Sequence, residues 1–240
     1  MDILKFKELM NFYAEKINIV FNEKQLEQFY NYMNLLLEWN EKINLTAITD
    51  PEEIIIKHFI DSLTISKYIE NNKQIADLGT GAGFPGIPLK IYRTDLNIVL
   101  VDSLNKRINF LNEVIDKLNL DNITTIHSRI EDFGKDKKYR EAFDYATARA
   151  VANLSVLSEY LIPVVKLKGQ AICMKGSEIE IEIDDSKTAI NILGGQIIKV
   201  DKFNLPETDI GRNIIIINKI KNTPSKYPRK AGVPSKEPLK

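Results

Sequence analysis

Apolar residues recur at three- and four-residue spacing in three stretches of the first seventy residues, at 3–17, 22–39 and 50–65. This period is typical of amphipathic helices whose apolar faces pack on other elements. Asn22 and Gln25 form a capping-box pattern at the start of the second stretch. Asp50 provides a cap for the third stretch, and Pro51 suits its first helical position. The sequence therefore predicts three N-terminal helices, followed by a junction at residues 71–73.

After residue 73 the pattern changes to short apolar runs that alternate with helical periods. Such alternation is typical of an α/β fold with a parallel sheet and helices on both faces. No helical period separates the last two strand patterns, so we expect them to pair antiparallel and finish a seven-stranded, mostly parallel sheet with an antiparallel final strand. The expected strands are 74–78, 97–102, 122–127, 143–148, 170–175, 195–203 and 212–220, with helices at 105–118 and 154–161.

The segment after the fifth expected strand has two interpretations. Residues 177–184 alternate apolar and polar side chains, as a half-buried strand does. Ser177 and Glu180, however, form a capping-box pattern, and a parallel sheet needs a crossover helix at this point. We expect a helix over residues 178–193.

A glycine-rich loop follows the first expected strand, with the sequence ADLGTGAGFPG at residues 76–86. Gly79, Gly81 and Gly83 allow close approach of a ligand to the backbone and a sharp turn into a helix. Asp77 can accept hydrogen bonds or pair with a cation. A positively charged adenosine cofactor such as S-adenosylmethionine suits this combination better than a pyrophosphate.

Other nucleotide and metal signatures do not match. The dinucleotide fingerprint requires a glycine three positions after its second glycine, where this chain has the bulky Phe84. No Gly-Lys-Ser/Thr follows, so the phosphate-loop signature also fails. His58, His127 and Cys173 show no metal-ligand spacing, and we expect no metal.

The ends of the second and third expected strands carry further candidates, because ligands bind beyond the carboxyl ends of parallel strands. Asp102 can accept hydrogen bonds from both ribose hydroxyls, and it can also cap the next helix. Ile130 and Glu131 follow the third strand, where a backbone amide and an apolar side chain can hold an adenine ring. A helix cap is the alternative there.

Composition limits the remaining possibilities. The 240 residues include 33 basic and 33 acidic side chains, so any affinity for nucleic acid must come from local patches. No stretch approaches the ~20 apolar residues of a membrane span, and the N-terminus shows no signal-peptide pattern. The single cysteine, Cys173, fits a reducing compartment. We expect a cytoplasmic monomer that does not bind membranes.

The C-terminal segment is strongly basic. Residues 219–240 contain seven lysines and arginines against one acid, Glu237, together with four prolines. Prolines at this density predict an extended or looped path rather than a helix. The segment is either a disordered, solvated terminus or a basic arm that contacts phosphates, in which case Tyr227 beside Arg229 offers a stacking surface.

Six segments carry a more specific signal: DLGTGAGFPGIPL at 77–89, VDSLNKR at 101–107, TARA at 147–150, YPRKAGVP at 227–234, WNEKINLT at 39–46 and HFIDSL at 58–63. Together they resemble the bacterial RsmG (GidB) methyltransferases over nearly the whole chain. The glycine loop alone is not specific, but the combination is. Members of that family transfer a methyl group from S-adenosylmethionine to guanine N7 in small-subunit (16S) ribosomal RNA.

The resemblance implies a Rossmann-like class I methyltransferase core over residues 73–221. It also implies an N-terminal helical extension, 1–72, packed on the sheet, and a basic tail, 222–240. The expected substrate is small-subunit ribosomal RNA or the assembled small subunit. The residues implied to line the cofactor site are Gly79, Phe84, Ile130, Glu131 and Arg149.

The chemistry expected from the residues agrees with transfer to N7. Guanine N7 has an in-plane lone pair and no proton, so the reaction needs alignment and a suitable field but no general base. Methylation of an exocyclic amine usually uses an Asn/Asp-Pro-Pro-aromatic loop after the fourth strand, whereas residues 146–150 read ATARA. Methylation at carbon-5 of a pyrimidine needs a cysteine nucleophile, and Cys173 lies inside an expected central strand.

Arg149 is the residue expected to orient cofactor and base, without proton transfer. Its guanidinium can contact guanine O6, a phosphate or the carboxylate of the cofactor, and a structural ion pair is the alternative. His58 and Asp61 share a helix face, either at the entrance to the site or as an ordinary pair. Four basic residues are expected to contact RNA: Arg129, Lys175, Arg229 and Lys230.

Two other classes of function stay open at this point. One is a methyltransferase that acts on a small molecule or a protein. The other is a non-catalytic nucleotide-binding module that uses the fold as a scaffold.

Overall fold

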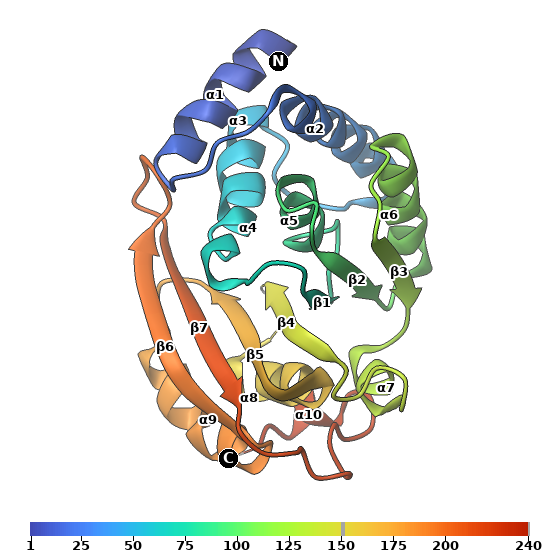
Figure 1. The fold of residues 1–240 in the computed structure, drawn as a ribbon, viewed down its shortest axis with the longest axis vertical. Helices are drawn as coiled ribbons and strands as arrows, with labels where there is room; N and C mark the ends of the chain where they lie inside the picture. Colours follow the sequence, from blue (N-terminus) through green and yellow to red (C-terminus); the bar gives the residue numbers. More distant parts are fainter. Residues whose placement is uncertain (150–151, 240) are drawn as a thin grey trace.

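The computed structural model describes residues 1–149 and 152–239. Ala150 of the TARA segment and Lys240 of the basic tail therefore lie outside the described residues, as does Val151. In the described part, seven strands form one sheet (Figure 1). They are β1 (Gln74–Leu78), β2 (Asn97–Asp102), β3 (Ile123–His127), β4 (Phe143–Arg149), β5 (Val165–Lys175), β6 (Gly195–Asn204) and β7 (Gly211–Lys219).

The strand order is β3-β2-β1-β4-β5-β7-β6. Strands β1 to β5 are parallel to one another, and β7 runs antiparallel to both β5 and β6. The predicted seven-stranded α/β fold is therefore confirmed, with the antiparallel strand β7 inserted between β5 and the edge strand β6.

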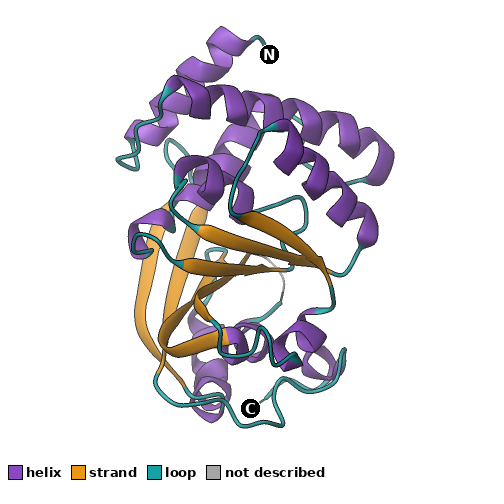
Figure 2. Cartoon of the chain, turned by 45° about the vertical axis from the view of Figure 1, so that its right-hand side comes forward, coloured by secondary structure: helices purple, strands orange, loops and turns teal. Residues whose placement is uncertain are grey.

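Helices cover both faces of this sheet (Figure 2). None of them, within residues 1–149 and 152–239, is long and apolar enough to cross a membrane. The α-helices are α1 (Ile3–Glu15), α2 (Glu23–Ile43), α3 (Pro51–Ile54), α4 (Asp61–Leu63), α5 (Gly86–Tyr92), α6 (Asn105–Lys117), α7 (Ile130–Lys135), α8 (Leu154–Leu161), α9 (Glu180–Ile192) and α10 (Val233–Lys236). A π-helical turn (Ile55–Ile60) joins α3 to α4, and 3-10 turns occur at Ser66–Tyr68 and Ile162–Val164.

The N-terminal helices begin as the sequence predicts. The Asn22 side chain accepts from the Gln25 amide while Gln25 caps the Asn22 amide, which completes the capping box at α2. Asp50 accepts from the amide of Glu53 at 2.9 Å and so caps α3. The third helix was expected to be continuous over 50–65; instead, the π-helical turn widens its middle. Such turns are frequent at functional sites.

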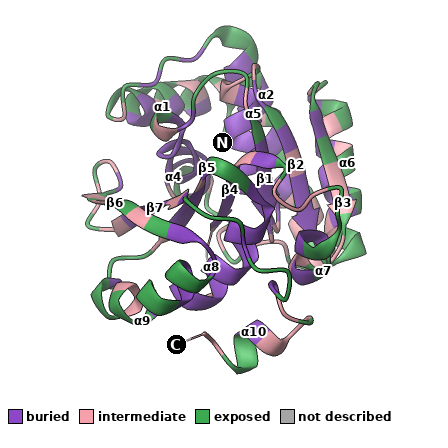
Figure 3. Ribbon diagram, turned by 60° about the horizontal axis from the view of Figure 1, so that its bottom comes forward, coloured by how far each residue is buried: buried purple, intermediate pink, exposed green. Residues whose placement is uncertain are grey.

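Side chains of alternate strand residues enter two separate cores, because successive side chains point to opposite faces of a sheet. Ile172 and Met174 of β5 belong to the core beneath the N-terminal helices, α5 and α6. Ala171 and Cys173 of the same strand belong to the core beneath α8 and α9. Strand β1 is largely buried between these two helical layers, whereas the edge strand β6 is mostly half-buried or exposed (Figure 3).

Helix α9 confirms the helical interpretation of the segment after β5, but its predicted cap is wrong. The helix begins at Glu180, its N-cap is Ile179, and no side chain caps it. The Glu180 carboxylate accepts from the amide of Ile179 at 3.2 Å, so it does not reach Ser177. Local competition for this carboxylate explains the shift.

The C-terminal segment packs against the sheet core and follows a mostly looped path, as the prolines predict, but it contains a short helix, α10, where no helix is expected. Pro234 lies within the first turn of α10, where a missing amide hydrogen costs nothing. Tyr227 is buried. Contacts to Glu131 of α7 and Tyr160 of α8 hold the end of this segment in place.

Candidate functional site

A cavity of about 690 Å³ opens where β1, β2, β3 and β4 end, next to the reversal of strand order between β1 and β4. Open α/β sheets bind ligands at this location. Its lining residues are Leu45, Thr46, His58, Gly79, Thr80, Gly81, Ala82, Phe84, Asp102, Ser103, Leu104, Arg107, Arg129, Ile130, Glu131, Arg149, Tyr160 and Ser235. Six of the predicted site residues that line it are Gly79, Gly81, Phe84, Asp102, Ile130 and Glu131.

The glycine loop forms one wall of this cavity. Gly81 has φ +63°, and a Cβ placed on it meets nothing within 4 Å, so the backbone is open to a ligand. Gly83 is packed instead: with φ +99°, its Cβ would stand 2.6 Å from Ile87 Cδ1 and 2.7 Å from the Tyr32 hydroxyl. Gly83 therefore packs against Ile87 and Tyr32 on the inner side of the loop and does not line the cavity.

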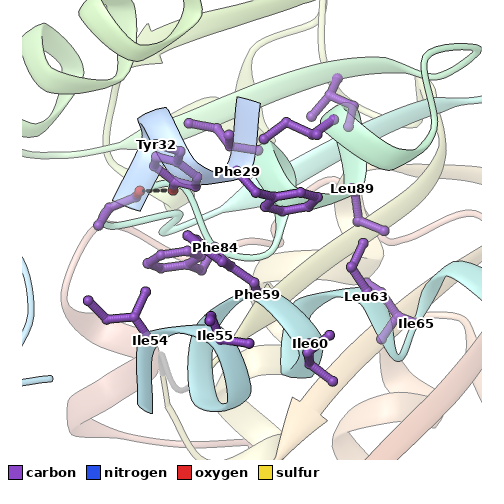
Figure 4. Close-up of a cluster of buried hydrophobic side chains, with 14 of the residues drawn as sticks. Phe29, Tyr32, Ile54, Ile55, Phe59, Ile60, Leu63, Ile65, Phe84 and Leu89 are labelled. Carbon is purple, nitrogen blue, oxygen red and sulfur yellow. Dashed lines mark hydrogen bonds between the residues drawn. The ribbon is translucent and has the colours of Figure 1, made fainter. Parts of the chain in front are cut away.

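Tyr32 of α2 supports the loop. Its hydroxyl donates to the carbonyl of Ala82, and its ring stacks on Phe59 at 5.4 Å (Figure 4). Phe84 lies against the same aromatic group, 5.6 Å from Tyr32 between ring centroids. The N-terminal helices thereby fix the position of the loop.

Asp77 is placed differently from its predicted role at the ligand. It is fully buried, and its Oδ2 accepts from the Thr80 hydroxyl at 2.6 Å and the Gly86 amide at 2.9 Å. Burial raises its pKa to about 6. Asp77 thus ties together the two ends of the glycine loop from outside the cavity.

Asp102 lines the cavity and also holds two loops. Its Oδ2 accepts from the Gly81 amide at 3.0 Å and lies 3.3 Å from Arg107 Nη1, while Oδ1 accepts from the Leu104 amide at 2.9 Å. Leu104 is itself the N-cap residue of α6, and no side chain caps that helix, so the predicted cap is absent and the ligand contact of Asp102 stays a prediction.

Glu131 and Arg129 flank the far end of the cavity. Glu131 is buried, and its Oε1 accepts from the Gly232 amide at 2.8 Å. Tyr160 of α8 and Ser235 of α10 share a hydroxyl hydrogen bond of 3.0 Å at the same end. Arg129 is exposed at the rim.

Arg149 lies at the end of β4, between the glycine loop and the N-terminal helices. Its Nη1 is 3.2 Å from Asp61 Oδ2, and its guanidinium carbon is 4.9 Å from the centre of the Phe84 ring. Its Nη2 is 3.2 Å from His58 Nδ1. The structural ion pair considered for Arg149 is present, and the side chain lines the cavity as well.

His58 is held in one neutral tautomer by these contacts. A guanidinium only donates, so Nδ1 accepts from Arg149 and Nε2 donates to the Thr46 hydroxyl at 2.9 Å. Burial and the neighbouring Arg149 charge lower the pKa of His58 to about 3. The ring stacks on Phe84 at 4.4 Å.

A second cavity of about 520 Å³ shares His58 and Arg149 with the first. Arg212, at the start of β7, donates through Nε to Asp61 Oδ1 at 3.1 Å. Asp61 is therefore paired with two arginines. The other residues that line this cavity are Ile48, Lys57, Asp61, Met174, Lys175, Gly176 and Arg212.

The remaining predicted RNA contacts lie apart from one another. Lys175 lines the second cavity but is paired with Glu182 at 2.8 Å. Arg229 pairs with the buried Glu159 at 2.7 Å, a placement that runs against its predicted contact with RNA. Lys230 is exposed.

Cys173 lies in the core on the opposite face of the sheet from the N-terminal helices, and burial raises the pKa of its thiol to about 12.

Comparison with known proteins shows the family to which this chain is related. A family model for GidB, described as rRNA small subunit methyltransferase G, matches residues 25–211. The chain belongs to the GidB family. It is 53% identical to Ribosomal RNA small subunit methyltransferase G of Desulforamulus reducens, over 94% of this chain and 95% of the relative. It is 52% identical to the protein of that name from Clostridium beijerinckii, over 99% and 100%.

Solved structures share the fold of this GidB-family chain at low identity. A SAM-dependent methyltransferase from Aquifex aeolicus has a TM-score of 0.51 and 15% identity, covering 71% of this chain and 94% of that chain. The TYW2 protein of M. jannaschii, solved in complex with AdoMet, has a TM-score of 0.50 and 14% identity, covering 85% and 79%.

Several site residues were not singled out from the sequence. Arg212 stands 151 positions from Asp61, and nothing near it in the sequence marks it. Tyr160 and Ser235 belong to a helix and a tail whose contact is set only by tertiary structure. Thr46 lies within the family-like segment 39–46, which offered a signal for it.

Proposed function

We propose that this GidB-family chain methylates guanine N7 in small-subunit (16S) ribosomal RNA in the cytoplasm, with S-adenosylmethionine as cofactor. The observation that carries the proposal is the pair of adjoining cavities that meet at Arg149 and His58. One cavity suits the cofactor and the other suits the target nucleotide. The names of the relatives, at about half identity over nearly their full length, support the ribosomal RNA substrate.

The residues of the first cavity fit the cofactor. Its volume of about 690 Å³ falls in the usual range for small-molecule sites. Open space at Gly81 admits a ligand against the backbone, and the Asp102 carboxylate faces the cavity for hydroxyl donors. The bound cofactor supplies an electrophilic methyl group.

The second cavity supports binding of a phosphate-linked base. Four basic residues line it: Lys57, Arg149, Lys175 and Arg212. Both arginines pair with Asp61, which also lines the cavity, while Lys57 pairs with Glu53 and Lys175 with Glu182. Arginine suits both guanine O6 and phosphate oxygens because its donors form a planar fork. We place the guanine here, with N7 directed towards the first cavity past Arg149.

The site supports direct transfer without a general base. His58 has both nitrogens engaged and stays neutral, since its pKa is lowered to about 3. A nucleophilic role for Cys173 is disfavoured by its burial in the opposite core. Arg149 therefore acts by orientation and by its electrostatic field, which is what attack by an unprotonated nitrogen requires.

The proposal is tested with purified protein, methyl-labelled S-adenosylmethionine and small-subunit ribosomal RNA, either free or in assembled subunits. We expect label in 7-methylguanosine after digestion to nucleosides. Label in another nucleoside would refute N7 as the acceptor. Label only in protein or small molecules would refute RNA as the substrate.

A further inference from the structure

The basic C-terminal segment is anchored before it reaches the cavity. Arg140 donates to the carbonyl oxygens of Thr223 at 2.7 Å and Tyr227 at 2.6 Å. Tyr227 is buried in the core beneath α8. The segment that follows, residues 227–236, is called the C-terminal strap below.

One buried ion pair fixes the strap to α8. The Glu159 side chain is 1% exposed, and its carboxylate accepts from Arg229 Nη2 at 2.7 Å and Nε at 3.0 Å. The backbone amide of Arg229 donates to the same carboxylate at 2.7 Å. A carboxylate this deeply buried is costly without a cationic partner, so the pair strongly restrains the strap.

The end of the strap forms part of the first cavity. The Gly232 amide donates to Glu131, and the Ser235 hydroxyl contacts that of Tyr160 at 3.0 Å. Ser235, Tyr160 and Glu131 line the cavity beside Ile130, at the end where the sequence predicts the adenine ring. Hydroxyls and a carboxylate can accept from an exocyclic amine, and the hydroxyls can also donate to ring nitrogens.

We propose that the C-terminal strap is the outer wall of the cofactor site at its adenine end, positioned by the Arg229–Glu159 pair. In this role Arg229 is a positioning residue for cofactor binding and not a contact to RNA. The inference rests on the proposed function of the first cavity. According to this inference, the basic tail increases the affinity of the protein for S-adenosylmethionine.

Calorimetric titration of the full-length protein with S-adenosylhomocysteine, the product form of the cofactor, tests the strap. Arg229→Ala should weaken binding by about tenfold or more, as loss of a supporting contact does. Lys226→Ala removes an exposed charge just outside the strap and should leave the Kd within about twofold of wild type. Arg229→Lys should recover part of the affinity. An unchanged Kd in Arg229→Ala would overturn the proposal.

Arg229→Ala leaves a buried carboxylate unpaired and can therefore misfold, so a second variant is needed to test the proposal. The double variant Arg229→Ala/Glu159→Gln removes both the ion pair and the buried charge. It should remain folded and show the same weakened Kd. Wild-type affinity in the folded double variant would overturn the role of the pair.

Limited trypsin digestion gives a readout that is independent of activity. S-adenosylhomocysteine should slow cleavage after Lys226 and Lys230 in wild type, and much less in the double variant. Equal cleavage of wild type with and without the ligand would overturn the strap as a wall of the site. In the titration, equal binding by wild type and Arg229→Ala would refute only the proposed role of the strap. Absence of binding by wild type would refute the assignment of the cavity to the cofactor as well.

Discussion

Arg149 and Asp61 form an ion pair, 3.2 Å between Nη1 and Oδ2, in the wall that separates the two cavities. β4 supplies the arginine, and the carboxylate begins α4, 88 positions earlier in the chain. Asp61 also holds Arg212, so this buried carboxylate keeps a cationic partner if either arginine is removed. The arrangement fixes the Arg149 guanidinium over Phe84.

Arg149→Ala should therefore leave the protein folded and lower kcat by about 100-fold, the usual cost of losing an aligned electrostatic group. Arg149→Lys keeps the charge but loses the planar fork, and should recover only a small part of kcat. Methyl transfer at saturating cofactor and the Tm of each variant provide the measurements. Lys187→Ala on α9, whose side chain is 66% exposed, is the control. Near-normal turnover in Arg149→Ala would remove this residue from the mechanism.

Two glycines of the same loop should respond differently to alanine. Gly83→Ala places a Cβ against Ile87 and Tyr32, so it should lower the Tm clearly. Gly81→Ala places its Cβ in the open cavity, with only the ~1 kcal/mol of strain that a left-handed alanine carries. We expect Gly81→Ala to fold but to lose cofactor affinity. Thermal melting and ligand titration of both variants distinguish these outcomes; intact affinity in a folded Gly81→Ala would contradict the placement of the cofactor.

RNA binding should depend on salt through the exposed rim of the first cavity. Arg129→Ala should lower the slope of log K against log salt by about 0.7, the value for one single-strand phosphate contact. Lys24→Ala is the matched control, because Lys24 is exposed beside Asn122 at the start of β3, whereas Arg129 follows the other end of that strand. Filter binding over a range of salt measures both slopes. An equal slope for Arg129→Ala and wild type would exclude a phosphate contact by Arg129.

His58 should make stability sensitive to acid. Its pKa is lowered from 6.5 to about 3 in the folded protein, so the unfolded chain binds the proton first as pH falls. The stability that neutral His58 contributes is present above pH 6.5 and is lost between 6.5 and about 3. His58→Gln lacks this dependence, so its Tm should fall less steeply than that of wild type over this window. Parallel Tm curves would show that His58 is not held neutral by its surroundings.

The strands and the glycine loop were predictable because their signals are local. The expected bounds of β1 and β2, and of helix α8, match the observed ones, since apolar runs there end at glycines, charges or caps. The predicted cap at Ser177 failed because the Glu180 carboxylate bonds to Ile179 instead. Local pattern alone does not decide between two competing caps.

The site residues that escaped prediction are brought in by long-range pairing. Arg212 meets Asp61 from β7, which lies between β5 and β6, and Ser235 meets Tyr160 from the tail that Arg229 ties to Glu159. The prolines of the tail favour an irregular path when considered alone. The tail does follow such a path up to α10, but the buried ion pair that holds it is revealed by no sequence pattern near either residue.

The central claim is most directly tested by mapping 7-methylguanine in small-subunit ribosomal RNA from cells with and without this protein. Our account predicts that one N7-methylated guanine disappears without the protein, returns with the wild-type chain and stays absent with Arg149→Ala. An identical set of 7-methylguanines in both kinds of cell would contradict it.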